Sequence, residues 1–380
     1  TGNIKDKSGL KEVKNYPIKN GAVVMENSDL LVRAALYKGA RPSDNSKEYS
    51  GIFRYDATNA SKISVGRYLV TGTGNVNITI VPETRTATGI SSADKNWFSA
   101  KENNFTISTP EQLAGLAYLV NDKGMTFNGK TIKLDRDISV AGGVDGKIWT
   151  AIGTSSAKAF QGVFDGQNHV IGGMRAESNG SYTALFGYCS GAVIKNLTVR
   201  GSSVNKSGMS YAAGLVSYAQ NCEISNCINR VNVTADGEIA GGIAAYATEG
   251  TSIKNCRNYG NISGATGVGG IAGICQSASD SVESCINIGN ITATGAGLGG
   301  TGGITGKLVG SVSDCINVGA VSGNDRYTGG IVGYTNGRKT STVTASQNQG
   351  SVTSSSNNEN AALGGVIGYG QFGAILSAAA

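Results

Sequence analysis

Histidine, proline, aromatic residues and charged residues are all scarce in this chain of 380 residues. The chain contains one histidine and four prolines, and only 15% of its residues are charged and 7% aromatic. A single histidine excludes a zinc motif of the HExxH kind, and any Ser-His-Asp or Cys-His site would have to use His169. The low charge of the repeats described below argues against nucleic-acid binding, which needs a basic stripe.

Long apolar runs are also missing, since none approaches the roughly 18 residues of a membrane span. The sequence starts at Thr1 without a methionine or a leader, so we expect any targeting signal to lie outside it. Seven cysteines are an odd number, which leaves at least one thiol free in a monomer. No cofactor is expected, and the cysteine spacing does not suggest a metal site.

One pattern is repeated through residues 212–370. A glycine followed by an apolar residue returns at steps of 28, 28, 33, 27 and 35 residues, starting at Gly214-Leu215. A second column returns at steps of 29, 29, 30 and 31, with asparagines two residues further on. Its members are Cys227, Cys256, Cys285, Cys315 and Ser346, followed by Asn229, Asn258, Asn287, Asn317 and Asn348. Repeats of this length are typical of solenoids, propellers or arrays.

The composition favours β-structure for these repeats. The chain has 57 glycines, twice the usual share of about 7%, without a collagen triplet. A coil of about 28 residues holds three short strands and three turns, and stacked coils place equivalent residues about 4.8 Å apart. We therefore expect a buried cysteine column, a hydrogen-bonded asparagine ladder and seven to eight coils from Phe160 onward. The longer steps predict loops within residues 293–301 and 351–362.

Two further elements precede the repeats. Residues 1–92 are predicted to form a small β-sandwich, with strands at 30–37, 63–70 and 75–81 and a hairpin at 72–74. Residues 93–380 form the second domain. Within it, Thr109-Pro110-Glu111-Gln112 has the features of a capping box and predicts a helix at about 109–123. That helix is expected to cover the open edge of the first coil.

From about Trp97 onward the chain resembles the GLUG-repeat surface proteins of bacteria. The matching segments are residues 107–113, 164–169 and 184–188. The resemblance implies a right-handed parallel β-helix on an exported, adhesin-like protein, located outside the cell or at its surface, with outer-membrane anchoring left open. Some relatives carry a peptidase elsewhere in their chains. The N-terminal domain more faintly resembles fimbrillin-type adhesins of Bacteroidetes.

The carboxylates do not indicate a catalytic site. Parallel β-helices include polysaccharide lyases and glycoside hydrolases, which need clustered acidic side chains on one face. Here the acidic residues fall at different phases of the repeat, and only Glu283 and Asp314 nearly share a column. Asp165 and His169 are interpreted as parts of a turn. The sequence thus predicts a protein that is not an enzyme, with no catalytic residues.

One column is a candidate binding surface. Five tyrosines share a repeat position that alternation places on the outer side of a strand, although Ile274 and Lys307 interrupt the row. These candidate ligand-binding residues are Tyr188, Tyr218, Tyr246, Tyr334 and Tyr369. They can stack on sugars or simply on one another.

We expect a non-enzymatic adhesion scaffold whose partner is a host or bacterial surface glycan or protein. Contact with a membrane is expected only through an anchor outside this sequence. The alternatives are a carbohydrate-active β-helix enzyme and a fimbrial subunit that assembles through its N-terminal domain.

Overall fold

The computed structural model describes residues 92–140, 149–178, 180–205, 210–237, 239–336, 341–371 and 375–377, together with six strands nearer the N-terminus. The chain divides into two compact units, Thr1–Ala87 and Thr88–Ala380. Among the described residues, no helix is long and apolar enough to cross a membrane.

The N-terminal unit is built from strands in two sheets. The strands expected at 30–37 and 75–81 are observed, whereas the expected strand at 63–70 and hairpin at 72–74 lie outside the described residues. One sheet has the order β1-β6-β2-β3, and β4 pairs antiparallel with β5. The bounds are β1 (Gly2–Asn3), β2 (Glu12–Lys19), β3 (Ala22–Val23), β4 (Leu31–Tyr37), β5 (Glu48–Arg54) and β6 (Asn75–Ile80).

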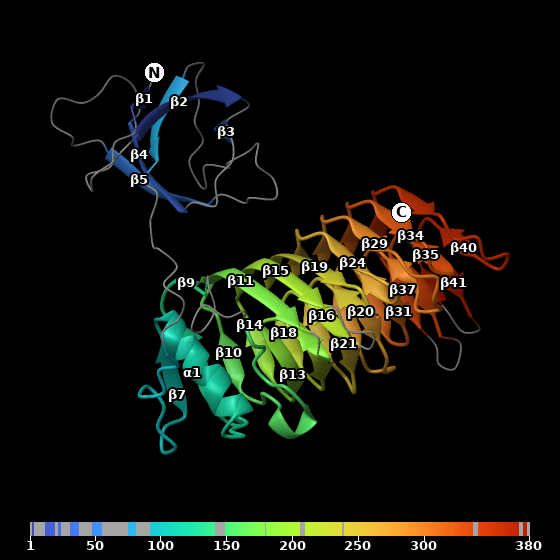
Figure 1. Cartoon of the computed structure of the whole chain (residues 1–380). Helices are drawn as coiled ribbons and strands as arrows, with labels where there is room; N and C mark the ends of the chain where they lie inside the picture. Colours follow the sequence, from blue (N-terminus) through green and yellow to red (C-terminus); the bar gives the residue numbers. More distant parts are fainter. Residues whose placement is uncertain are drawn as a thin grey trace. The chain divides into compact units, whose positions relative to one another are not determined.

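The second unit is a parallel β-helix, as the sequence predicts (Figure 1). Its coils stack strand upon strand into four parallel sheets. The first sheet has ten strands. They are β7 (Asn104–Ile107), β8 (Thr131–Leu134), β10 (Val163–Asp165), β14 (Val193–Lys195), β18 (Glu223–Ser225), β22 (Ser252–Lys254), β27 (Ser281–Glu283), β32 (Ser311–Ser313), β37 (Thr342–Thr344) and β42 (Ile375–Ser377).

The second sheet has twelve strands and divides into two branches after β19. Gly260 lies at the division, between the two branches, and a Cβ there would lie 1.9 Å from the carbonyl oxygen of Val231, so only glycine fits. The strands before the division are β9 (Ile138–Ser139), β11 (Val170–Ser178), β15 (Thr198–Asn205) and β19 (Ile228–Ala235). One branch holds β23 (Arg257–Asn258), β28 (Ile286–Asn287), β33 (Ile316–Asn317) and β38 (Gln347–Asn348). The other holds β24 (Ile262–Gly264), β29 (Ile291–Ala293), β34 (Val321–Gly323) and β39 (Val352–Ser354).

The third and fourth sheets each have seven strands. The third contains β12 (Tyr182–Thr183), β16 (Tyr211–Ala213), β20 (Ile239–Gly241), β25 (Val268–Gly269), β30 (Thr301–Gly302), β35 (Tyr327–Gly329) and β40 (Ala362–Gly364). The fourth contains β13 (Phe186–Ser190), β17 (Val216–Gln220), β21 (Ala244–Thr248), β26 (Ala272–Cys275), β31 (Thr305–Leu308), β36 (Val332–Thr335) and β41 (Ile367–Gly370).

The expectation of three strands per coil is therefore wrong, because the glycine–apolar pair forms a corner between the third and fourth sheets. Gly242 and Ile243 lie between β20 and β21. A Cβ on Gly242 would lie 2.6 Å from Cγ of Asn258 and 2.2 Å from the carbonyl oxygen of Gly270. The glycine column thus leaves the space that the asparagine column fills, which explains why the two columns recur together.

The asparagine ladder is present and buried. Asn258 Nδ2 donates to Asn287 Oδ1 at 2.7 Å, and the Asn229–Asn258, Asn287–Asn317 and Asn317–Asn348 contacts have the same length. Each Nδ2 also donates to the carbonyl oxygen two residues ahead, at 2.8–3.0 Å. The cysteine column lies in the core, and all seven cysteines are free and buried.

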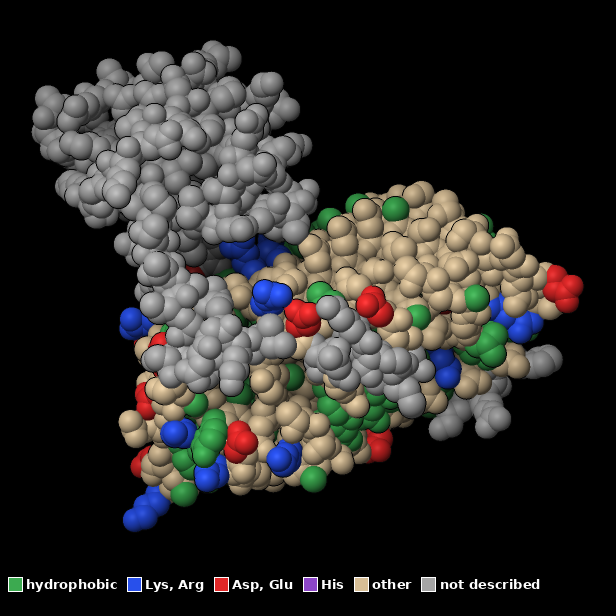
Figure 2. All heavy atoms as spheres, in the orientation of Figure 1, with side chains coloured by type: hydrophobic (Ala, Val, Ile, Leu, Met, Phe, Trp, Pro, Cys, Tyr) green, Lys and Arg blue, Asp and Glu red, His purple; other side chains and the backbone are tan. Residues whose placement is uncertain are grey.

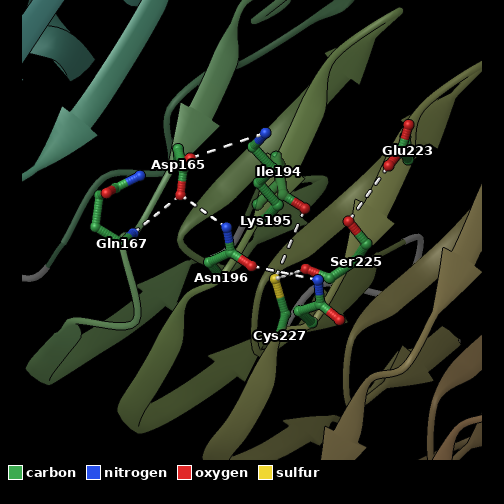
Figure 3. Close-up of polar contacts among 9 residues, drawn as sticks. Asp165, Gln167, Ile194, Lys195, Asn196, Glu223, Ser225 and Cys227 are labelled. Atoms are coloured by element: carbon green, nitrogen blue, oxygen red, sulfur yellow. Dashed lines mark hydrogen bonds and ion pairs between the residues drawn. The ribbon is translucent and has the colours of Figure 1, made fainter.

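The turn that precedes the cysteine column is shown in Figure 3. Asp165 Oδ1 accepts hydrogen bonds from the Gln167 backbone N–H and from Asn196 Nδ2, both at 3.0 Å. Burial raises the pKa of Asp165, but these hydrogen bonds and the Lys195 charge lower it below its usual range overall. Cys227 Sγ contacts the carbonyl oxygens of Ser225 and Ile194 from the inner side. Asp165 therefore has the turn role that its sequence context predicts.

Helix α1 (Pro110–Asn121) lies at the first coil, and a short 3₁₀ helix, η2 (Ser156–Lys158), lies before β10. Thr109 caps α1 by accepting from the Gln112 N–H at 3.2 Å, and Gln112 Oε1 accepts from the Ser108 N–H at 2.7 Å. The Thr109 bond is the N-cap half of a capping box, whereas the Gln112 side chain accepts from Ser108, one residue before the N-cap, rather than from Thr109 itself. The buried face of α1 joins the same core as β7 and β8, which confirms the predicted covering helix.

Candidate functional site

The tyrosine column predicted from the sequence lies along the fourth sheet. Parallel pairing puts its members in one register from Tyr188 through Tyr218 and Tyr246, and again from Tyr334 to Tyr369. Ile274 and Lys307 occupy the two positions between these groups. Tyr188 is only 8% exposed and Tyr369 is 40% exposed, so the column is less accessible than simple alternation implies.

A second row of tyrosines explains this burial. Tyr182, Tyr211 and Tyr327 come from the third sheet and pack against the first row. We call Tyr182, Tyr188, Tyr211, Tyr218 and Tyr246 the N-terminal tyrosine cluster, and Tyr327, Tyr334 and Tyr369 the C-terminal tyrosine cluster. Together they form the tyrosine ledge. The sequence signal for the second row was a tyrosine six or seven residues before a member of the first, on the far side of each corner.

The rings of the ledge cover one another's faces. Tyr188 and Tyr218 are stacked with centroids 4.6 Å apart, and Tyr218 and Tyr246 are 4.9 Å apart. In the other cluster, Tyr327 and Tyr369 are stacked at 4.6 Å. A ligand therefore meets mainly ring edges and hydroxyl groups, with free ring faces only where a stack ends.

A polar row borders these hydroxyl groups. Tyr188 Oη donates to Gln220 Oε1 at 2.6 Å, and Gln220 Nε2 donates to Glu249 Oε2 at 2.8 Å. The other cluster has one comparable bond, in which Tyr334 Oη donates to Gln371 Oε1 at 2.8 Å. Burial and neighbouring charges raise the pKa of Tyr188 to about 12, so its hydroxyl group stays protonated near neutral pH.

The ledge lies on a surface with little charge. Figure 2 shows the visible face of the β-helix as mostly uncharged polar atoms and backbone, with scattered charged groups. A group of hydrophobic side chains interrupts this surface in the lower part of the β-helix in this view.

Glu283 and Asp314, which nearly share a column of the repeat, are not in register in the structure. Glu283 lies in register with Ser313 rather than with Asp314, and its Oε2 pairs with Lys254 Nζ at 2.9 Å. Another carboxylate, Asp280, accepts three backbone N–H groups, from Gly250, Thr251 and Ser277. These side chains stabilise turns and strand edges.

His169 lies in the turn with Asp165, as expected. Its Nδ1 is 3.4 Å from Asp137 Oδ1, and the same oxygen accepts the Val170 backbone N–H at 2.9 Å. Among the described residues, no three His, Cys, Asp or Glu side chains are grouped so that they could hold a metal ion.

Sequence reasoning missed Asp325, which lies between β34 and β35 and is fully buried. Neither of its carboxylate oxygens has a hydrogen-bond partner among the described residues, although Thr301 lies nearby. Burial raises its pKa to about 7. The sequence offered no signal, because the loop that turns Asp325 inward departs from strand alternation.

Comparison with protein-family models and with curated proteins gives no match. Among solved structures, a Bacteroides ovatus protein provisionally named an immunoglobulin A1 protease matches with a TM-score of 0.57 and 21% identity, over 73% of this chain and 86% of that one. A second structure, named IgA1 protease, aligns with a TM-score of 0.46 and 13% identity, over 97% of this chain but only 28% of that one. The first likeness shows a shared fold, and the second supports no inference.

The expectation that the chain is not an enzyme is contradicted by the first match, because a protein of the same fold is named as an enzyme. The physical reason is that the repeat constrains only the core columns. Outer side chains and inserted loops, such as residues 294–300, remain free to carry chemistry. What the comparisons establish is a β-solenoid similar to that of the Bacteroides ovatus protein.

Proposed function

We propose that this chain binds an extended surface glycan along the tyrosine ledge, as the recognition part of an exported cell-surface protein. The observation that carries the proposal is the in-register column of tyrosine rings, in which Tyr188 and Tyr334 each donate a hydroxyl hydrogen bond to a glutamine amide, that of Gln220 and that of Gln371. Solenoids present long regular surfaces of this kind for binding. The resemblance of the repeats to GLUG-type surface proteins supports the exported location.

A glycan fits the chemistry of the ledge. Sugars combine apolar C–H faces with hydroxyl groups, and tyrosine combines an apolar ring with a polar tip. The amide of Gln220 adds donors and an acceptor beside the rings. Since the tyrosines are already held by stacking, binding them costs little further side-chain entropy.

The test is a glycan array probed with the full chain and three tyrosine variants. Tyr218→Ala and Tyr369→Ala each remove one ring from a different cluster, and we expect each to weaken binding at least about ten-fold, the equivalent of about 1.4 kcal/mol. Tyr259→Ala is the control, because Tyr259 lies under Arg230 on the second sheet, away from the ledge. Urea midpoints confirm that each variant is folded.

Two results oppose the proposal. If no glycan binds, or if Tyr259→Ala weakens binding as much as the ledge variants do, the ledge is not a glycan site. Binding of the ledge to a surface protein, with no glycan bound, identifies the other class of partner and contradicts our choice.

Catalysis is a second candidate function, favoured by the name of the Bacteroides ovatus protein that shares the fold. Incubation of immunoglobulin A1 with this chain, followed by electrophoresis, tests peptide cleavage. His169→Ala is the informative variant, since His169 is the single histidine and lies beside Asp137. Release of reducing ends from any bound glycan tests the carbohydrate-active alternative. If both substrates remain intact, the catalytic candidates are rejected and binding is the function that remains.

A further inference from the structure

The ledge is interrupted at two successive coils between its clusters. In the fourth sheet, Ile274 and Lys307 replace tyrosine. In the third sheet, Gly267 and Gly300 directly precede Val268 and Thr301, which pair in register, so that row has no side chains at these coils. The Ile274 side chain fills the space beside Gly267, whose added Cβ would lie 3.2 Å from Ile274 Cδ1.

Lys307 is the unusual residue of this interruption. It is half-buried, and its Nζ donates to Gln276 Oε1 at 3.2 Å. Burial lowers the pKa of this lysine. Among the described residues, none places a carboxylate within ion-pair distance of Nζ.

Two lysines of the first sheet do have carboxylate partners. Lys254 pairs with Glu283, and Lys195 lies 3.8 Å from Asp165. Removing an ammonium group from water without a counter-charge is unfavourable. A neutral side chain of similar length would fit the same position without that cost, so the charge of Lys307 is not needed for packing.

We propose that the interruption at Gly300 and Lys307 is a subsite for an acidic sugar, whose carboxylate or sulfate group accepts a hydrogen bond from Lys307 Nζ while the rest of the glycan follows the tyrosine clusters on either side. This subsite rests on the proposed glycan function. It specifies an anionic unit at one position of the binding surface, at the coils between Glu249, which accepts from Gln220, and Arg326, which lies over the Tyr327 ring. Gln276 orients the ammonium group.

The charges match this occupant. A charge-assisted hydrogen bond is about twice as strong as a neutral one. The space beside Gly300 is closely packed, because an added Cβ would lie 2.5 Å from the Gly306 carbonyl oxygen and 2.9 Å from Tyr334 Cβ, so the sugar would lie over Lys307 on the surface. A lysine recognises the anion as a point charge, so carboxylated and sulfated sugars both satisfy the site.

Binding of defined sugars to the full chain tests the subsite. The probes are 3′-sialyllactose against lactose, and tetrasaccharides of hyaluronan, which carries carboxylates alone, and of keratan sulfate, which carries sulfates alone, to distinguish carboxylate from sulfate. We expect the wild type to bind the acidic member of the first pair at least about ten-fold more tightly, in line with one charge-assisted hydrogen bond. Lys307→Met, which keeps the apolar stem, should abolish that preference and leave lactose binding unchanged within about two-fold.

Two control variants distinguish an effect of the positive charge at position 307 from an effect of losing any positive charge of the protein. Lys133→Met removes an exposed lysine on the first sheet and should change neither affinity. Lys307→Arg keeps the charge and should retain a preference for the acidic sugar. Thermal unfolding of each variant shows whether the fold is intact.

The outcomes distinguish the two proposals. If the wild type binds no glycan, both fail. If it binds lactose and 3′-sialyllactose equally through the ledge, or if Lys307→Met keeps the acidic preference, only the subsite is overturned and Lys307 is a packing residue.

Discussion

At the scale of single residues, Asp325 is a fully buried carboxyl group next to Thr301. It has no hydrogen-bond partner among the described residues, and burial raises its pKa from 3.8 to about 7. The folded state therefore binds a proton more tightly than the unfolded chain does. Between about pH 4 and pH 7 the folded protein holds more protons, so stability falls as pH rises through this range.

This shift leads to a prediction for Asp325→Asn. The wild type should lose up to about 4 kcal/mol of unfolding free energy between pH 4 and pH 8, because each unit of pKa difference corresponds to about 1.4 kcal/mol. Asp325→Asn should remove most of this loss and be the more stable protein at pH 8. Urea unfolding at both pH values measures it, with the exposed Asp236→Asn as control. Parallel pH profiles for Asp325→Asn and the wild type would be inconsistent with a buried, unpartnered carboxyl group.

At the scale of elements, the asparagine ladder and the glycine corners act together. Asn287 donates to Asn317 and Gly289, and it accepts from Asn258. The corner at Gly270 leaves the room for its amide, since a Cβ there would lie 2.3 Å from Asn287 Cγ. The ladder thus fixes the register of neighbouring coils from within.

Asn287→Leu should accordingly be strongly destabilising. Three buried polar groups lose their partner, and each such loss costs about 1–3 kcal/mol, so we expect a decrease of at least about 3 kcal/mol. Asn290→Ala is the matched control, because Asn290 is exposed and its Oδ1 accepts a single backbone N–H, from Ala320. Urea denaturation compares the two variants, and equal losses would show that the inner ladder contributes no more than an exposed asparagine.

The repeat columns were predictable because each is a local spacing repeated many times. The cysteine and asparagine columns and the loop at 294–300 follow from such spacings, whereas the covering helix at Pro110–Asn121 follows from the single helix-start signal at Thr109-Pro110-Glu111-Gln112. The fourth sheet was not predictable, because a glycine followed by an apolar residue can stand either at a corner between two strands or inside one strand. The sequence also does not predict contacts across the corner, such as the edge-to-face contact between Tyr211 and Tyr218. They depend on the angle between two sheets rather than on sequence distance.

At the scale of the whole molecule, the proposed binding surface is the tyrosine ledge, with the N-terminal tyrosine cluster at one end and the C-terminal tyrosine cluster at the other. Three coil steps separate Tyr246 from Tyr334, which is about 14 Å at the spacing of neighbouring strands. A glycan long enough to reach both clusters binds the second one at a high effective concentration, whereas a shorter one reaches only one cluster.

The most direct test of the account is therefore the affinity of the full chain for a size-graded series of the glycan that it binds best. We predict a sharp rise in affinity, at least about ten-fold, once the oligosaccharide spans both clusters, as two linked sites require. The rise should disappear in Tyr369→Ala, which loses the exposed ring of the C-terminal tyrosine cluster. An affinity that is independent of length, or a rise that persists in Tyr369→Ala, would contradict binding along the tyrosine ledge.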